Sequence, residues 1–161
     1  MLTRTYAPRG KTPCITVSTE VNARLYMSSS ISPCGNLFFM IRNKPFHSAD
    51  VIEYLDQLRK ESGRRLLVIW DGASIHDSVE LREWLSRQPE GDFFLAKQPH
   101  YSPELNADEQ VWHHLKGQKL KNTCNQNVKE LRLKIEQAMD ELKENKNLIE
   151  AFFRHPKLGY N

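Results

Sequence analysis

Two carboxylates, Asp71 and Glu109, are candidate ligands for a divalent metal ion. The stretch VIWDGASIH places Asp71 directly after an apolar run that ends in Trp70. Sites in open α/β sheets gather at the carboxyl ends of strands. Mg²⁺ or Mn²⁺ prefers oxygen ligands, and Mg²⁺ commonly takes only one or two carboxylates from a protein. A second carboxylate beside Asp71 would support two-metal phosphoryl transfer. The alternative interpretation of Asp71 is an Asp-Gly turn.

Glu109 is the best candidate for the second carboxylate, with 37 residues between it and Asp71. Its local sequence also has a purely structural interpretation. Asn106-x-x-Glu109 is a capping-box pattern, in which the Glu side chain reaches back to the backbone at the start of a helix. Local sequence alone favours this cap. The neighbouring Asp108 is expected on the buried side, because apolar residues follow it four and seven positions later, and a lone buried charge is costly.

Histidine and lysine side chains surround the second candidate carboxylate. On a helix, Glu109, His113 and Lys116 share a face at spacings of four and seven, which makes His113 and Lys116 possible site neighbours. The pair His113 and His114 does not match the His-Glu-x-x-His zinc pattern, since no second His lies four residues away. His76 is expected to have a structural role in the turn after the strand.

The order of expected elements is β-β-α-β-α-β-α-α, which predicts an α/β layered fold. The run over 66–70 is apolar throughout, so we expect a central strand covered by helices on both faces. The expected elements are a hairpin of strands over 23–32 and 36–43, a helix over 48–63 with Ser48 as N-cap, the strand over 66–70, a helix opening at Asp77-x-x-Glu80, a strand over 92–96, a loop leading into a helix over 100–120, and a long helix opening at Asn127-x-x-Glu130.

Composition indicates one soluble globular domain. The chain has 161 residues, of which 39% are hydrophobic and 27% charged. It has no apolar run near the ~20 residues of a membrane helix, and its first residues lack the apolar core of a secretion signal. The three cysteines are far apart and form no Cys-x-x-Cys pair. We therefore expect reduced thiols in a cytoplasmic protein without a membrane partner.

Basic side chains gather in two blocks. Residues 1–49 carry six Lys or Arg against the single acid Glu20, and residues 115–134 carry six against Glu130. This distribution fits a polyanion such as DNA, with Lys116, Lys119 and Lys121 as candidate phosphate contacts. A solvated basic surface explains the charge equally well.

Two motifs resemble a known family. LLVIWDGASIH, followed by PHYSPELNADEQVWHHLK, is similar to the mariner-type insertion-sequence transposases of bacteria. These are DDE superfamily endonucleases with a ribonuclease-H-like fold. RTYAPRGKTP also resembles a segment found early in that family's catalytic domain, and the resemblance covers most of residues 3–125. It implies that Asp71 and Glu109 are the second and third catalytic carboxylates and ligands of Mg²⁺ or Mn²⁺, in place of the capping role that local sequence favours for Glu109.

The sequence departs from the family pattern at its start. The family's first catalytic Asp lies just upstream of the RTYAPRG-like segment, which begins here at Arg4, and the first Asp of this chain is Asp50. The family's N-terminal helix-turn-helix region is missing as well, and Ala107 stands where the family usually has Pro. We therefore expect an N-terminally truncated, ribonuclease-H-like three-layer α/β core over 1–122, lacking its first strand, and a C-terminal helical extension over 123–161 with a long helix.

The resemblance implies the C-terminal part of a DDE transposase, which cleaves and transfers DNA strands at transposon ends but is inactive alone because the first Asp is missing. The alternative is a non-catalytic DNA-binding or assembly fragment. It would complement a separately encoded N-terminal half, or inhibit an intact transposase. A decayed gene remnant is a third interpretation, and a homodimer is left open. The expected location is the bacterial cytoplasm.

Overall fold

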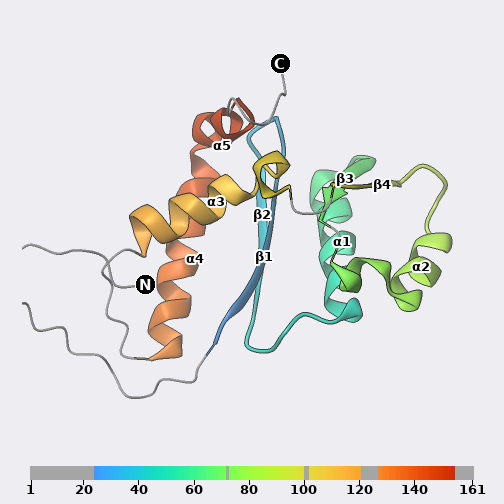
Figure 1. Cartoon of the computed structure of the whole chain (residues 1–161), viewed down its shortest axis with the longest axis horizontal. Helices are drawn as coiled ribbons and strands as arrows, with labels where there is room; N and C mark the ends of the chain where they lie inside the picture. Colours follow the sequence, from blue (N-terminus) through green and yellow to red (C-terminus); the bar gives the residue numbers. More distant parts are fainter. Residues whose placement is uncertain (1–23, 72, 100–101, 121–126, 155–161) are drawn as a thin grey trace, which may run out of the picture.

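The structure is a computed structural model that describes residues 24–71, 73–99, 102–120 and 127–154 (Figure 1). It is a mixed α/β fold, as expected. No helix within these ranges is long and apolar enough to cross a membrane. The elements are β1 (Tyr26–Ile31), β2 (Leu37–Arg42), α1 (Ser48–Ser62), β3 (Leu66–Trp70), the 3-10 turn η1 (Ser74–Asp77), α2 (Val79–Ser86), β4 (Phe93–Lys97), the 3-10 turn η2 (Pro103–Leu105), α3 (Glu109–His114), the π-helical segment η3 (Leu115–Lys119), α4 (Val128–Glu144) and α5 (Lys146–Phe153).

Strands β1 and β2 form the expected antiparallel hairpin, with Tyr26 opposite Arg42 and Ile31 opposite Leu37. The chain reverses over residues 32–36, where Gly35 has a φ of 75°. This left-handed conformation is one that glycine adopts without steric cost. The turn also packs closely on the first residue of α5, Lys146. Gly35 is therefore required both by the turn and by the helix beside it.

We expect Gly35→Ala to destabilise the protein by more than the roughly 1–2 kcal/mol that a left-handed conformation costs an L-residue. An added Cβ would lie 2.8 Å from Lys146 Cβ and 2.9 Å from Lys146 O. Gly63→Ala is the matched control, because Gly63 has a φ of 61° but no atom within 4 Å of the new Cβ. Urea unfolding of both variants measures the difference, and equal losses would contradict the packing argument.

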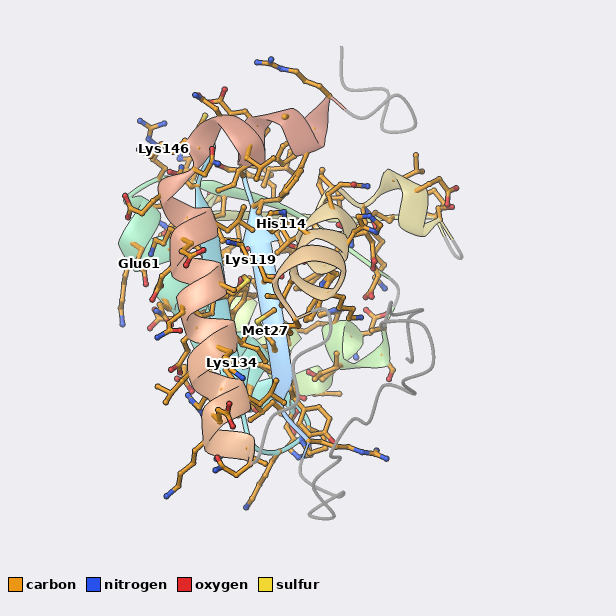
Figure 2. The ribbon with its side chains drawn as sticks, turned by 90° about the vertical axis from the view of Figure 1, so that its left-hand side faces the viewer. Met27, Glu61, His114, Lys119, Lys134 and Lys146 are labelled. Carbon is orange, nitrogen blue, oxygen red and sulfur yellow. The ribbon has the colours of Figure 1, made fainter. Side chains whose placement is uncertain are left out.

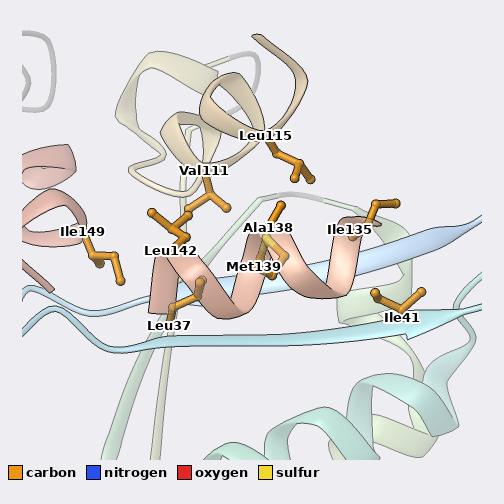
Figure 3. Close-up of a cluster of buried hydrophobic side chains, with 9 residues drawn as sticks. All are labelled: Leu37, Ile41, Val111, Leu115, Ile135, Ala138, Met139, Leu142 and Ile149. Carbon is orange, nitrogen blue, oxygen red and sulfur yellow. The ribbon is translucent and has the colours of Figure 1, made fainter. Parts of the chain in front are cut away.

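The hairpin lies between two helical layers. α4 and α1 run on opposite sides of it (Figure 1). On one side, β2 packs with α3, α4 and α5 in the larger hydrophobic cluster (Figure 3). On the other side, Phe38 of β2 packs against a second cluster built by α1 and α2. The larger cluster consists of Leu37, Ile41, Val111, Leu115, Ile135, Ala138, Met139, Leu142 and Ile149, and the second of Val51, Leu55, Leu58 and Leu81.

Strand β3 differs from the sequence prediction of a central strand covered on both faces. It pairs in parallel with β4, Leu66 opposite Phe93, and β1 pairs with β2, so the described strands make two separate two-stranded sheets. Alternate side chains of β3 pack against the cluster of α1 and α2. On the other face Leu67 is 67% exposed and Ile69 45% exposed. Among the described elements the covering helices lie on one face only, which an apolar run cannot reveal.

The long helix α4 begins as predicted, because Asn127 Oδ1 accepts a hydrogen bond of 2.8 Å from the Glu130 N–H. Its buried residues include Ile135, Ala138 and Leu142. They pack into the larger cluster together with β2 and α3. The proposed boundary between a core over 1–122 and an extension over 123–161 falls in residues 121–126, outside the described residues, and stays a prediction.

Two helices begin at residues other than those expected. In α1 the N-cap is His47 rather than Ser48, and the His47 N–H donates to Asp50 Oδ2 at 2.9 Å. In α2 the N-cap is Ser78 rather than Asp77. In both helices the shift is one residue, and the predicted helix itself is present. Shifts of this size are common because helix ends fray.

Candidate catalytic site

Asp71 leaves β3 at its carboxyl end, where its side chain is 65% exposed. Its Oδ1 accepts a hydrogen bond of 3.0 Å from the Ala73 N–H and lies 3.3 Å from His76 Nε2. Within the described residues, Oδ2 has no hydrogen bond or ion pair. One oxygen thus holds the turn while the other is available, so the turn interpretation and the ligand interpretation are compatible.

His76 packs under the end of β3. Its ring stacks on Trp70 with 4.5 Å between centroids and 18° between planes. Burial lowers the pKa of His76, and the charge of Asp71 partly opposes that effect. The imidazole is therefore neutral at pH 7, and Nε2 is directed at Asp71 from a fixed ring. This position fits the structural role expected for His76 in the turn, and the contact that the structure shows is with the Asp71 carboxylate.

Glu109 is the first residue of α3, and its side chain is exposed. The capping box that local sequence favours does not form. Asn106 Oδ1 accepts from the Asp108 N–H at 3.0 Å, and the Glu109 carboxylate has no hydrogen bond within the described residues. The carboxylate is thus free to bind an external ligand.

Asp108 is turned inward, as its position before an apolar stripe predicts. Its Oδ2 accepts a hydrogen bond of 2.7 Å from Ser29 Oγ on β1, and its Oδ1 is enclosed. Burial raises the pKa of Asp108 to about 6, against the lowering effects of the Ser29 and Trp112 side chains. Of the two adjacent carboxylates, only that of Glu109 faces solvent.

The segments that carry Asp71 and Glu109 are joined through Gln98, which follows β4. Its backbone N–H donates to Trp70 O at 2.8 Å, and its side-chain Nε2 donates to Leu105 O at 3.0 Å. The sequence alone gives no signal that singles out this residue. Within the described ranges no three His, Cys, Asp or Glu residues gather closely enough to hold a metal ion.

His113 and Lys116 follow Glu109 along the same chain segment, and both are exposed. His113 belongs to α3, but Lys116 lies in the π-helical segment that begins at Leu115. The Lys116 Nζ lies 5.2 Å from the centroid of the Trp112 ring, in a cation–π contact. This contact orients Lys116 on its own helix. A role for either residue at the site stays a prediction.

The second basic block is largely paired within the chain. Lys119 Nζ lies 2.5 Å from Glu141 Oε2 on α4, and Figure 2 shows Lys119 beside that helix. Lys134 pairs with Glu130 at 2.6 Å on α4 itself. Such partners reduce the net field that a phosphate would meet. Lys121 lies outside the described residues.

Comparison with known proteins identifies the family and the fold of the chain. A family model described as "DDE superfamily endonuclease" matches residues 1–132. The structure is similar to the crystal structure of the Mos1 strand transfer complex, with a TM-score of 0.60, 13% identity, and 92% of this chain and 49% of that chain covered. It is also similar to the crystal structure of the Mos1 mariner paired end complex with Mn, with a TM-score of 0.57 and 12% identity. That match covers 98% of this chain and 51% of the other. No curated protein matches the chain.

The chain spans about half the length of those Mos1 chains. At 12–13% identity the likeness shows the fold, and it confirms the ribonuclease-H-like α/β assignment. The family model shows the family as well as the fold, because it covers residues 1–132 of 161. That range includes both candidate carboxylates. The chain is therefore a member of the DDE superfamily endonucleases.

Proposed function

We propose that this chain carries the second and third catalytic carboxylates of a mariner-type DDE transposase, Asp71 and Glu109, and serves in metal-dependent cleavage and transfer of DNA strands at transposon ends. The observation that carries the proposal is that a DDE family model spans both residues, each of which has an exposed carboxylate. Insertion-sequence DNA in the bacterial cytoplasm is the proposed substrate.

A divalent ion fits the chemistry of these donors. Hard cations such as Mg²⁺ and Mn²⁺ favour carboxylate oxygen, and Asp71 and Glu109 would hold the ion. When bound, the ion would lower the pKa of an attacking hydroxyl or water and stabilise the oxygen that leaves. The Mn named in one of the similar structures supports a divalent metal. The chain's own contribution is orientation, since His76 and the Ala73 N–H fix Asp71.

We further propose that the chain does not cleave DNA by itself. No Asp precedes Asp50 in the sequence, and no three potential metal ligands gather in the described part of the chain. Two carboxylates hold a metal pair poorly, so the first catalytic Asp would come from outside these 161 residues. Mg²⁺-dependent nicking by the purified chain, lost in Asp71→Ala, would contradict this.

Calorimetry with Mn²⁺ tests whether the two carboxylates form a metal site. We expect the wild type to bind Mn²⁺. Asp71→Asn and Glu109→Gln should each weaken binding by at least about tenfold, because each removes a direct ligand. Changes to residues that only support the ligands already cost ~10–100-fold in metal affinity. Asp77→Asn is the control, because that exposed carboxylate pairs with Lys97 nearby. No wild-type binding, or equal binding in all variants, would show that the two carboxylates form no metal site.

A second candidate function is a non-catalytic assembly fragment. The observation that favours it is the pair of two-stranded sheets, in which the described residues leave one edge of β1 and of β3 unpaired and expose Leu67, Ile69 and Phe94. Unpaired strand edges are templates for an added strand. The proposed occupant is a strand from a separately encoded N-terminal transposase half.

Co-expression separates the two functions. Restored strand transfer with an upstream fragment that carries the first Asp supports complementation and a residual catalytic role. Suppression of an intact transposase, without restored activity, supports interference by a non-catalytic fragment. In that case Asp71→Asn would suppress as well as the wild type does.

A further inference from the structure

We infer that Gln98 is a positioning residue that holds the segments carrying Asp71 and Glu109 at a fixed separation. The inference rests on the proposed function of those two carboxylates. Neither is touched by Gln98 itself. Its role is to connect the backbone of Trp70, directly before Asp71, to the backbone of Leu105, four residues before Glu109.

The backbone of Gln98 is fixed by the parallel pair of strands. Trp70 and Lys97 are register partners at the ends of β3 and β4. The Gln98 N–H donates to Trp70 O at 2.8 Å, so the ladder of hydrogen bonds continues one residue past β4. Gln98 therefore lies beside the peptide group that leads into Asp71. This backbone contact does not depend on the Gln98 side chain.

The side chain of Gln98 reaches the other segment. Its Nε2 donates to Leu105 O at 3.0 Å in a partly buried hydrogen bond. Leu105 ends the turn η2 and lies four residues before Glu109. The Gln98 side-chain amide thus joins the end of β3 and β4 to the chain that enters α3.

The stretch from Leu105 to Glu109 is short and internally braced. The Leu105 N–H donates to Ser102 O at 3.0 Å, and Asn106 Oδ1 accepts from the Asp108 N–H at 3.0 Å. A displacement at Leu105 would therefore be transmitted to Glu109 rather than absorbed between them. Farther along, Asp108 is bonded to Ser29 on β1 and Val111 is fully buried, so the start of α3 has a defined position onto which the segment from Leu105 leads.

Gln98→Leu tests the role of the side-chain amide, because it removes the donor but keeps the backbone N–H and a similar volume. Gln88→Leu is the matched control. The Gln88 Nε2 also donates a partly buried bond to a backbone carbonyl, that of Trp84 at 3.1 Å, at the end of α2. We expect Gln98→Leu to weaken Mn²⁺ binding by about tenfold, the lower range for a change outside the ligands, and Gln88→Leu to leave it within twofold. Gln98→Met, which also lacks the donor and adds no charge, replaces Gln98→Leu if that variant does not fold.

Hydrogen exchange in metal-free protein gives a readout that does not depend on the proposed function. In Gln98→Leu we expect faster exchange of the amides over residues 105–111 and unchanged exchange in α4. If the wild type does not bind Mn²⁺, the proposed function fails, and faster exchange still supports the connection made by Gln98. Unchanged exchange overturns the inference. Faster exchange with undiminished Mn²⁺ affinity also overturns it, because Gln98 would then be only structural.

Discussion

Asp71→Asn is expected to lower DNA cleavage by about a thousandfold or more when the chain is complemented by a fragment that carries the first catalytic aspartate. The substitution preserves size and leaves a side-chain oxygen to accept the Ala73 N–H. What it removes is the negative charge that would hold the metal ion. Metal-ion stabilisation of transition-state charge is worth several kcal/mol, and each ~1.4 kcal/mol corresponds to a factor of ten in rate.

The measurement is single-turnover nicking of supercoiled DNA in Mn²⁺ by the co-purified fragments. Asp77→Asn is the control at the same end of β3, since Asp77 is also exposed and near His76 in the chain, but its carboxylate pairs with Lys97. We expect this control to stay within a few fold of the wild type. A similar loss in both variants would mean that charge near β3, rather than a ligand at Asp71, supports cleavage.

Local sequence signals predicted the elements that local interactions determine. The hairpin forms over the strands predicted for it, and α4 begins at Asn127, whose side chain caps it. The position of Asp71 at a strand end and the inward turn of Asp108 also follow from pattern alone. In each case a few neighbouring residues decide the conformation.

Contacts between distant residues could not be predicted in this way. The apolar run of β3 requires burial but does not say which neighbours supply it, and the described neighbours cover one face only. The capping box predicted at Asn106 does not form, because the Asn106 side chain accepts from the nearer Asp108 N–H instead of the Glu109 N–H. The bond from Gln98 to Leu105 and that from Ser29 to Asp108, 79 residues apart, have no sequence signature.

The second large effect concerns Asp108 and the dependence of stability on pH. Burial raises the pKa of this carboxyl from 3.8 to about 6. Below pH 3.8 the group is protonated in both folded and unfolded chains and has no influence on the pH dependence. Between pH 4 and pH 6 the unfolded chain loses its proton first, so the free energy of unfolding falls as pH rises. Above pH 6 the full penalty remains, which for a shift of about two units is up to about 3 kcal/mol.

Asp108→Asn should remove this pH dependence, because the amide is neutral and its oxygen can still accept from Ser29 Oγ. We expect the difference in unfolding free energy between variant and wild type to change by up to about 3 kcal/mol in favour of the variant from pH 4 to pH 8. Urea unfolding in EDTA measures it without bound metal, and Asp140→Asn, which alters an exposed carboxylate of α4, is the control. Parallel curves for Asp108→Asn and the wild type would mean that water reaches Asp108. The inward carboxyl would then carry no penalty, and the enclosed Oδ1 would be solvated in solution.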